Sequence, residues 1–199
     1  MIYVLSDIHG NERRFASVLE QIRLQPEDTL YVLGDVIDRH PGGIRILQKL
    51  MQMPNVKMLL GNHEYMMLRA LGHPFDGEKS TFLVRRRAKA HWYRNGGQVT
   101  YRAFWRLPKG AREQIIAFLQ ALPLRYDIAV NGVSYRLVHG APEEAYVPGG
   151  KYKNPVHFAV WKRWERTDTF PEGPILVFGH TPTQYYQDQM PMQIWRKAR

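Results

Sequence analysis

Side chains that bind metal ions recur in this sequence directly after apolar runs. Asp7 and His9 follow the run at 2–6, and Asp35 follows the run at 29–33. The complete set is Asp7, His9, Asp35, Asp38, Asn62, His63, His139 and His180. Carboxylate, imidazole and amide groups suit divalent Mn, Fe or Zn, and the sequence contains no Cys that could supply thiolate. The set therefore predicts a metal site built from oxygen and nitrogen atoms.

Taken one at a time, these residues have structural explanations. Asp7 could form an Asx turn or cap a helix, Asn62 could cap the helix that follows it, and a histidine at a strand end could simply be hydrogen-bonded there. Five such coincidences, all at the exits of predicted strands, are much harder to accept than one shared site. We therefore interpret the set as a single catalytic centre.

The elements that must position this set follow a β-α-β-α-β pattern. Residues 2–6, 29–33 and 56–60 are predicted strands, and apolar positions at helical spacing after Asn11 and after 41–43 predict two connecting helices. Such an alternation implies parallel strands whose carboxyl ends meet at one edge of the sheet. Asp7, Asp35 and Asn62 are separated by 28 and 27 residues, about one strand-helix repeat, so we expect them to lie together.

The remainder of the chain is predicted to complete one domain over 1–199. Residues 64–122 form an Arg-rich, aromatic helical insertion in this interpretation. Asn131-Gly132 stands between two alternating runs and predicts a β-hairpin, whose second strand ends at His139. A last strand at 175–180 ends at His180. The fold class is α/β.

The composition is that of a globular chain with a basic surface. Its 199 residues are 44% hydrophobic and carry a formal net charge of +10, with a dense basic run at 85–94. That run could attract nucleic acid or phosphorylated substrates, or it could be an exposed helix face. No basic segment precedes the first apolar run and no apolar stretch approaches the ~20 residues of a membrane span, so we expect a cytoplasmic protein.

The ligand set favours two cations and an anionic substrate. Asp35 is expected to bridge two ions ~3.5–4 Å apart. The other ligands divide into Asp7 and His9 on the first ion, and Asn62, His139 and His180 on the second. Because two dications outweigh two aspartates, a phosphate dianion fits the centre, attacked by a metal-activated hydroxide. His63 is the expected proton donor to the leaving group, with Asp38 fixing its tautomer.

Five short blocks occur in order along the chain. They are DIHG at 7–10, GDVIDR at 34–39, GNHE at 61–64, LVHG at 137–140 and FGHTP at 178–182. Together they resemble the phosphoprotein phosphatase family of metallophosphoesterases, in particular its bacterial and lambda-phage serine/threonine phosphatases. The resemblance implies a calcineurin-like fold, with mixed β-sheets in a sandwich, flanking helices and a helical cap.

The same resemblance implies site roles. It implies two divalent cations, Mn²⁺ first, with Fe or Zn as alternatives, and it agrees with the His63–Asp38 acid dyad. It also implies two arginines that bind phosphate. Arg39 matches one within its block, and VWKRWER at 160–166 points to Arg163 for the other, with Arg166 as a competing choice.

Departures from the family pattern bear on the substrate. The related symmetrical diadenosine tetraphosphate hydrolases typically carry Ala at position 38 and Asp at position 64, whereas this chain has Asp38 and Glu64. The family also usually continues past its GHTP block into further strands, so we expect either that the given sequence is a shortened piece or that an edge of the sheet is missing. These features predict a phosphatase of phosphorylated proteins or peptides, on Ser/Thr and also Tyr. The alternatives are a symmetrical dinucleoside tetraphosphate hydrolase, a nucleic-acid phosphodiesterase and a metal-poor binding protein.

Overall fold

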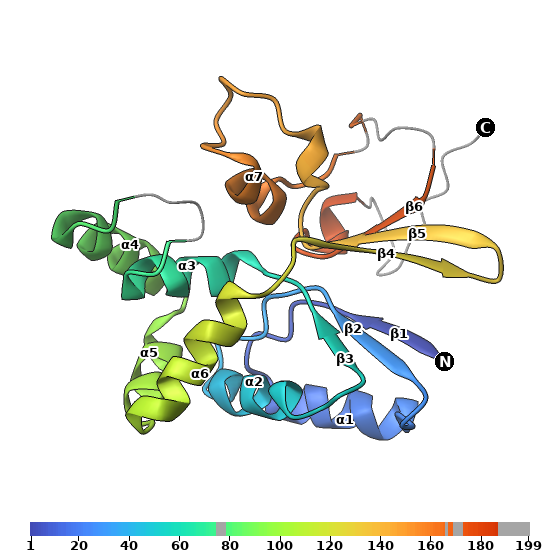
Figure 1. Ribbon diagram of the computed structural model, residues 1–199, viewed down its shortest axis with the longest axis horizontal. Coiled ribbons are helices and arrows are strands. Elements are labelled where there is room, and N and C mark those ends of the chain that lie inside the picture. Colours follow the sequence, from blue (N-terminus) through green and yellow to red (C-terminus); the bar gives the residue numbers. More distant parts are fainter. Residues whose placement is uncertain (75–78, 166, 169–172, 187–199) are drawn as a thin grey trace.

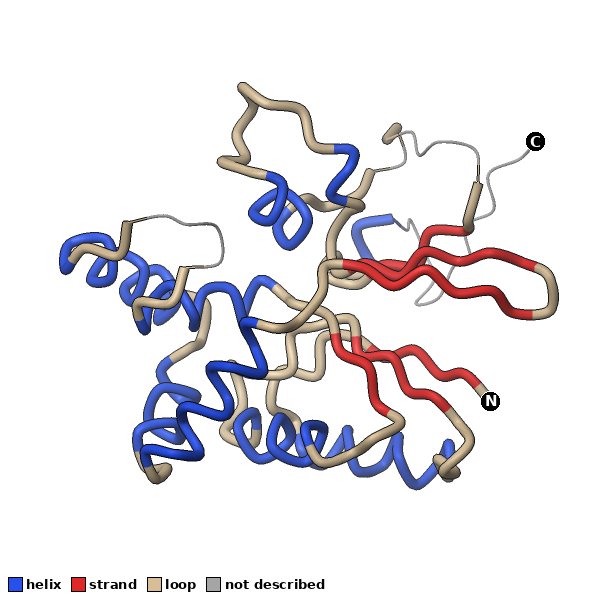
Figure 2. Tube along the Cα trace, viewed as in Figure 1, coloured by secondary structure: helices blue, strands red, loops and turns tan. Residues whose placement is uncertain are grey.

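Two three-stranded sheets and the helices around them make up the described part of the protein (Figure 1). The computed structural model describes residues 1–74, 79–165, 167–168 and 173–186. The strand orders are β1-β2-β3 in the first sheet and β4-β5-β6 in the second. The second sheet lies alongside the first, with a shared core of Tyr31, Leu33, Leu59 and Leu137 between them, and the strand ends of each sheet converge near the centre of the view (Figure 2).

The first sheet confirms the predicted β-α-β-α-β alternation. Its strands are β1 (Ile2–Leu5), β2 (Thr29–Val32) and β3 (Val56–Met58), paired in parallel, and its connections are α1 (Glu12–Ile22) and α2 (Gly43–Met51). The side chain of Asn11 accepts a hydrogen bond from the Arg14 N–H at 3.1 Å, which is the predicted cap of α1. All three strands therefore deliver their carboxyl ends to one edge.

Alternation along β2 explains how the first sheet is buried on both faces. Leu30 and Val32 belong to the core shared with α1 and α2, whereas Tyr31 and Leu33 belong to a second core with Leu137 of the second sheet. Successive side chains of a strand point to opposite faces, so one strand contributes to both cores. The loops at its end are thereby held between the two sheets.

The second sheet contains the predicted hairpin. Strand β4 (Arg125–Val130) is antiparallel to β5 (Val133–Val138), and β5 is parallel to β6 (Ile175–Phe178). Asn131 and Gly132 between β4 and β5 have φ of 48° and 77°, the conformation that a type I′ turn requires. Because β5 and β6 are parallel, residues that follow them also share one edge.

Four helices occupy the region predicted as a helical insertion. They are α3 (Asn62–Leu71), α4 (Phe82–Arg94), α5 (Gln98–Trp105) and α6 (Lys109–Gln120), so the helical region begins two residues earlier than predicted. A helix that the sequence analysis did not identify, α7 (Pro155–Trp161), follows the cap residue Asn154, and two short 3₁₀ segments span Glu143–Ala145 and Thr183–Tyr186. None of the helices among the described residues is long and apolar enough to cross a membrane.

Candidate metal centre

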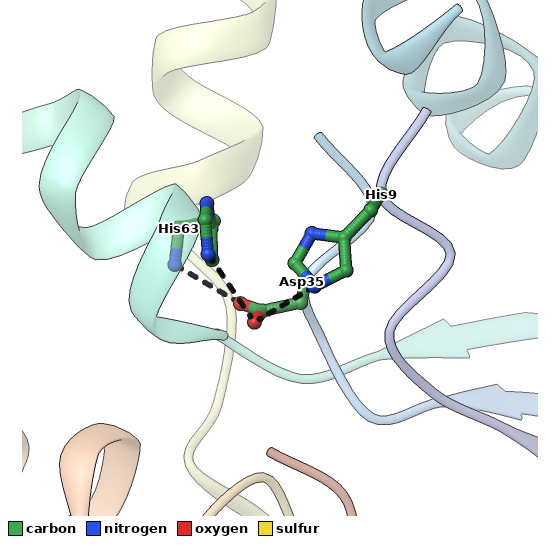
Figure 3. Close-up of side chains that lie close together, drawn as sticks. All are labelled: His9, Asp35 and His63. Carbon is green, nitrogen blue, oxygen red and sulfur yellow. Dashed lines mark hydrogen bonds and ion pairs between the residues drawn. The ribbon is translucent and has the colours of Figure 1, made fainter. Parts of the chain in front are cut away.

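Asp35 is at the centre of a cluster of histidines at the edge of the first sheet. Its Oδ2 lies 3.8 Å from His9 Nε2 and 3.9 Å from His63 Nε2, and its Oδ1 lies 3.5 Å from His139 Nε2. Figure 3 shows the carboxylate of Asp35 between the side chains of His9 and His63. Only 1% of Asp35 is exposed, so this charge has almost no access to solvent.

Two groups of potential ligand atoms share this aspartate. The first ligand group is His9, Asp35 and His63, and the second ligand group is Asp35, His139 and His180. In each group the candidate atoms lie within 4.8 Å of one another. The two remaining predicted ligands lie beside them, since Asp7 Oδ1 is 3.8 Å from His9 Nε2 and Asn62 Oδ1 is 3.0 Å from His139 Nε2.

The structure thus brings all six predicted metal ligands into one cluster, with Asp35 where a bridging residue is expected. One detail differs from the sequence analysis. His63, which was assigned only as a proton donor, also has its Nε2 near enough to Asp35 and His9 to act as a ligand. Its role, like the other assigned roles, remains a prediction.

Hydrogen bonds to backbone carbonyls orient two of the histidines. The Nδ1 of His9 lies 3.2 Å from the carbonyl oxygen of Ile37, and the Nδ1 of His139 lies 2.6 Å from that of Leu33. In this arrangement each Nδ1–H donates to the carbonyl, and the lone pair of Nε2 faces Asp35. Such outer contacts fix the tautomer of metal-binding histidines in proteins.

Backbone strain is concentrated at the same place. Eight non-glycine residues of the described chain have positive φ, and six of them belong to the predicted site: Asp7, His9, Asp35, Asp38, Arg39 and His180. The other two, Arg23 and Asn131, end a helix and form the hairpin turn. A non-glycine residue in this region costs on the order of 1–3 kcal/mol and persists only where its surroundings enforce it. Here the surroundings are the tight exits of the strands.

Glu64 enforces the conformation of the loop that carries Asp35. Its carboxylate accepts hydrogen bonds from the backbone N–H groups of Asp35 and Val36, both at 2.9 Å, and of Ile37 and Gly61, at 3.3 and 3.2 Å. Glu64 is fully buried. The sequence analysis used it only to distinguish subfamilies, whereas the structure shows that it ties the exits of β2 and β3 together.

His63 and Asp38 form the predicted pair. The Nδ1 of His63 lies 2.6 Å from Asp38 Oδ2, and both side chains are essentially inaccessible to solvent. The same Oδ2 accepts a hydrogen bond from the indole N–H of Trp92 at 2.7 Å, and the Asp38 N–H donates to Thr100 Oγ1 at 2.9 Å. Trp92 and Thr100 therefore connect helices α4 and α5 to the centre.

These two contacts were missed from the sequence. Trp92 and Thr100 both lie in the region predicted as a helical insertion, to which the sequence analysis assigns no site residue. Neither follows a strand, and no spacing relates them to Asp38, which is 54 and 62 residues away. Only the tertiary structure brings them together.

Burial raises the pKa values of the carboxyl groups in the cluster and lowers those of the histidines, as expected for a site that binds cations. Burial and the charge of Glu64 raise the pKa of Asp35 well above its ordinary value, and burial raises the pKa of Asp38 to about 7. Burial, with lesser contributions from neighbouring charges, lowers the pKa of His9, His63 and His180 to about 3. Neutral imidazoles offer lone pairs, and buried carboxylates require a compensating positive charge. The donor set therefore fits divalent cations.

A cavity of about 740 Å³ opens onto the cluster. Arg39 and Arg163, the two predicted phosphate ligands, both line it, together with Trp161 and Asn95. The guanidinium of Arg163 also lies 4.8 Å from the ring centre of Tyr185. The competing choice, Arg166, lies outside the described residues. An anion bound between Arg39 and Arg163 would face the metal-binding cluster.

Comparison with protein families gives a match over nearly the whole chain. A family model described as "Calcineurin-like phosphoesterase" matches residues 1–197. The curated proteins that resemble the chain include the symmetrical bis(5'-nucleosyl)-tetraphosphatases of Cronobacter sakazakii (strain ATCC BAA-894) and Salmonella newport (strain SL254). Each is 34% identical over 68 residues, which is 33% of this chain and 24% of the relative. The match thus spans about a quarter of each relative's length.

Solved structures also resemble the chain. A metallophosphoesterase from Sphaerobacter thermophilus has a TM-score of 0.46 and 19% identity, and covers 82% of this chain and 50% of its own. A serine/threonine phosphatase from Saccharomyces cerevisiae has a TM-score of 0.44 and 15% identity, covering 71% and 42%. A putative diadenosine tetraphosphatase has a TM-score of 0.45 and 17% identity, covering 75% and 54%.

Proposed function

The chain belongs to the calcineurin-like phosphoesterase family, and from that premise we propose that it is a metal-dependent phosphomonoesterase that acts on phosphorylated proteins or peptides. Its two sheets with flanking helices form the fold that the sequence predicted for this family. The finer assignment, to the bacterial and phage-like protein phosphatases, depends on the site. The observation that carries it is the buried His63–Asp38 pair beside Asp35.

The chemistry of the leaving group explains why this pair is informative. Cleavage of a serine or threonine phosphate expels an alkoxide, which is strongly basic and needs a proton in the transition state. Cleavage within a phosphate chain expels a phosphate group, which is weakly basic and needs none. A site that buries a proton donor next to its ligand cluster is therefore suited to alkyl phosphates.

The residues of the chain have the following roles in this proposal. Asp7, His9, Asp35, Asn62, His139 and His180 hold two divalent cations, for which Mn²⁺ is our first choice. When bound, these ions supply a polarised phosphoryl oxygen and an activated water. Arg39 and Arg163 bind the remaining phosphoryl oxygens and orient the ester for in-line attack.

His63 supplies the proton. Because burial raises the pKa of Asp38 to about 7, the pair retains one dissociable proton up to about that pH. Burial lowers the pKa of His63 to about 3, so the imidazole is neutral before the reaction. The 2.6 Å hydrogen bond lets the Asp38 carboxyl pass its proton to Nδ1 while Nε2–H is donated to the leaving group. The hydrogen bond from Trp92 stabilises the Asp38 carboxylate that results and holds it in place.

The test is His63→Asn on two substrates. With a phosphoserine peptide we expect turnover to fall by ~10²–10⁴, as for loss of a general acid. With diadenosine tetraphosphate we expect a much smaller loss, and the metal content of the variant should stay unchanged. His73→Asn, in the loop after α3, is the matched control. Equal losses on both substrates, or loss of metal, would make His63 a ligand and remove the argument for alkyl phosphates.

The second candidate is hydrolysis of symmetrical dinucleoside tetraphosphates. It is favoured by the curated relatives, whose names state this activity. The ligand cluster alone does not distinguish the two, because both reactions need cations and an anion-binding cavity. Wild-type kcat/KM on the phosphoserine peptide and on diadenosine tetraphosphate separates them directly, and a preference of more than tenfold for the nucleotide would favour the second candidate.

A further inference from the structure

A third arginine, Arg14, lines the same cavity as Arg39 and Arg163. It lies in the first turn of α1, and the cavity is also lined by Asn11, Phe15 and Val18 from the same helix. Residues three, four and seven apart share one face of a helix. Arg14 is therefore on the face of α1 that borders the cavity, whereas Arg13 does not line it.

The charge of Arg14 is not compensated by any residue in the described part of the chain. Its backbone N–H donates to the side chain of Asn11, and its guanidinium forms no hydrogen bond or ion pair with the described residues. The nearest acid in sequence, Glu12, is engaged elsewhere. Both of its carboxylate oxygens bind Arg45, with Arg45 Nε at 2.6 Å from Oε1.

The first turn of α1 is fixed against the loop that carries Arg39. The N–H of His40 donates to the carbonyl of His9 at 3.2 Å, and the N–H of Gly42 donates to the carbonyl of Gly10 at 3.1 Å. Gly10 has φ of 69°, and a Cβ there would lie 2.3 Å from the His40 oxygen, so only glycine allows the approach. His40 itself lines the cavity. The backbone that leads into the first turn of α1, and so carries Arg14, is thus held at a defined place beside the cavity.

This arrangement supplies more positive charge than one phosphate needs. In the proposed function, two dications with Arg39 and Arg163 already compensate the phosphoryl group that is hydrolysed. We infer that Arg14 forms a second anion subsite, which binds a second phosphoryl group carried by the substrate and favours substrates with two or more phosphates over a lone monoester. The inference rests on the proposed phosphoesterase function of the neighbouring centre.

Two sources could supply that second phosphoryl group. One is the adjoining phosphate of a nucleotide polyphosphate chain, and the other is a second phosphorylated side chain of a peptide. Both present negatively charged phosphoryl oxygens, for which a guanidinium with free N–H donors is the preferred partner. Substrates of both kinds, each with a single-phosphate counterpart, distinguish the sources.

The experiment compares Arg14→Gln with Arg13→Gln, its neighbour outside the cavity. We would measure kcat/KM on p-nitrophenyl phosphate, diadenosine tetraphosphate, and a peptide carrying one or two phosphoserines, at fixed free Mn²⁺. For Arg14→Gln we expect the preference for the multiply phosphorylated substrate to fall about tenfold, mainly through KM, as for loss of one charge-assisted hydrogen bond. Arg13→Gln should leave this preference unchanged.

Three other outcomes are decisive. A preference that is the same in Arg14→Gln and wild type would overturn the subsite, and an equal loss on all substrates would place Arg14 at the hydrolysed phosphate instead. Hydrolysis of none of these substrates by the wild type would overturn the proposed function. In that case calorimetric binding of inorganic tripolyphosphate still tests the subsite, with about tenfold weaker binding to Arg14→Gln expected and equal binding counting against it.

Discussion

The two halves of the metal centre are supported in different ways. The first-sheet half follows β1, β2 and β3, and its internal hydrogen bonds include His63 N–H to Asp35 Oδ1 at 3.0 Å and His9 N–H to the Asp35 carbonyl at 2.9 Å. The second-sheet half follows β5 and β6 and consists of His139 and His180. The first-sheet half is therefore stabilised by hydrogen bonds between its own residues.

The second-sheet half is held by the first. The ring of His139 hydrogen-bonds to the Leu33 carbonyl, at the end of β2, and its Nε2 contacts Asn62. The backbone N–H of His180 donates to Asp7 Oδ2 at 3.0 Å. For Asp35 the dependence is one-way, because the hydrogen bonds that support this shared residue come from its own half. Changes in the first half should disturb both ligand groups, and changes in the second should disturb one.

The largest expected effect is that of Asp35→Asn. Because Asp35 belongs to both ligand groups, the change removes the shared carboxylate, and we expect metal content and turnover to fall together to background. The loss in metal affinity should exceed the ~10–100-fold that follows loss of an outer-shell partner. The measurement is elemental analysis of the purified variant, with turnover of p-nitrophenyl phosphate.

His180→Asn is the matched comparison. It lies in the second-sheet half, so we expect that variant to keep the ion of the first ligand group and to lose only the other. If Asp35→Asn retained two ions, the bridging role would be refuted. If His180→Asn lost both, the one-way dependence between the halves would be wrong.

Glu64→Gln tests whether the hydrogen bonds within the first-sheet half stabilise the protein. Four backbone N–H groups converge on the two oxygens of Glu64, and the amide of glutamine would turn an NH₂ group toward two of them. Leaving buried donors unpaired costs about 1–3 kcal/mol. We expect the melting temperature at pH 8 to fall by roughly 4–8 °C. Glu20→Gln, on the exposed face of α1, is the control, and an unchanged melting temperature in Glu64→Gln would contradict the role.

Trp92→Phe tests the contact between the helical insertion and the first half. Phenylalanine keeps an aromatic ring in the buried site but removes the indole N–H that binds Asp38 at 2.7 Å. A hydrogen bond to a charged group is worth about 1.5–3 kcal/mol, so we expect turnover of a phosphoserine peptide to fall about tenfold or more. Turnover of p-nitrophenyl phosphate, whose leaving group is less basic, should fall less.

Trp105→Phe provides the comparison, because Trp105 lies in the same helical region but is 50% exposed, and its ring contacts are with Tyr101, Phe104 and Arg112. A Trp92→Phe variant that slowed both substrates equally would indicate a general loss of structure. In that case the indole N–H would have no specific effect on the acid pair.

The two halves also differ in how far the sequence could predict them. The first half comes from consecutive strand-helix repeats, so spacing alone places Asp7, Asp35 and Asn62 at one edge. The hairpin turn at Asn131-Gly132 could be predicted equally well, because only a few residue types tolerate the positive φ that a type I′ turn requires. His139 and His180 could be recognised as strand-end residues, but spacing does not state which edge they meet.

What the sequence could not provide were contacts between distant segments. Glu64 and Trp92 occur in a helical region whose own pattern indicates only packing. Their hydrogen bonds to the centre depend on how that region folds back, which no periodicity encodes. Arg14 is a similar case, since its position on α1 is predictable but the cavity beside it is lined by six separate segments of the chain. An analysis based on strand ends therefore does not identify side chains that support or extend a site.

The smallest expected effect is a pH dependence of stability that belongs to the first half alone. In metal-free protein, burial raises the pKa of Asp38 and Glu64 to about 7, so the native state holds protons that the unfolded chain has already lost. The histidines act oppositely, because burial lowers the pKa of His9, His63 and His180 to about 3. Between pH 6.5 and about 7.5 the unfolded histidines still lose protons, which offsets the carboxyl groups, and above about pH 7.5 the histidines are neutral in both states.

From pH 7.5 to 9 only the buried carboxyl groups still titrate, and they lie in the first half. The native state then binds more protons than the unfolded state, so stability must fall as pH rises. We expect urea unfolding of the metal-free protein to show a loss on the order of a few tenths of a kcal/mol over this interval. Added Mn²⁺ should abolish the loss, because a nearby dication favours the ionised carboxylates at every pH in the range. A flat profile without metal, or the same slope with and without Mn²⁺, would show that these buried carboxyl groups are compensated by the protein itself.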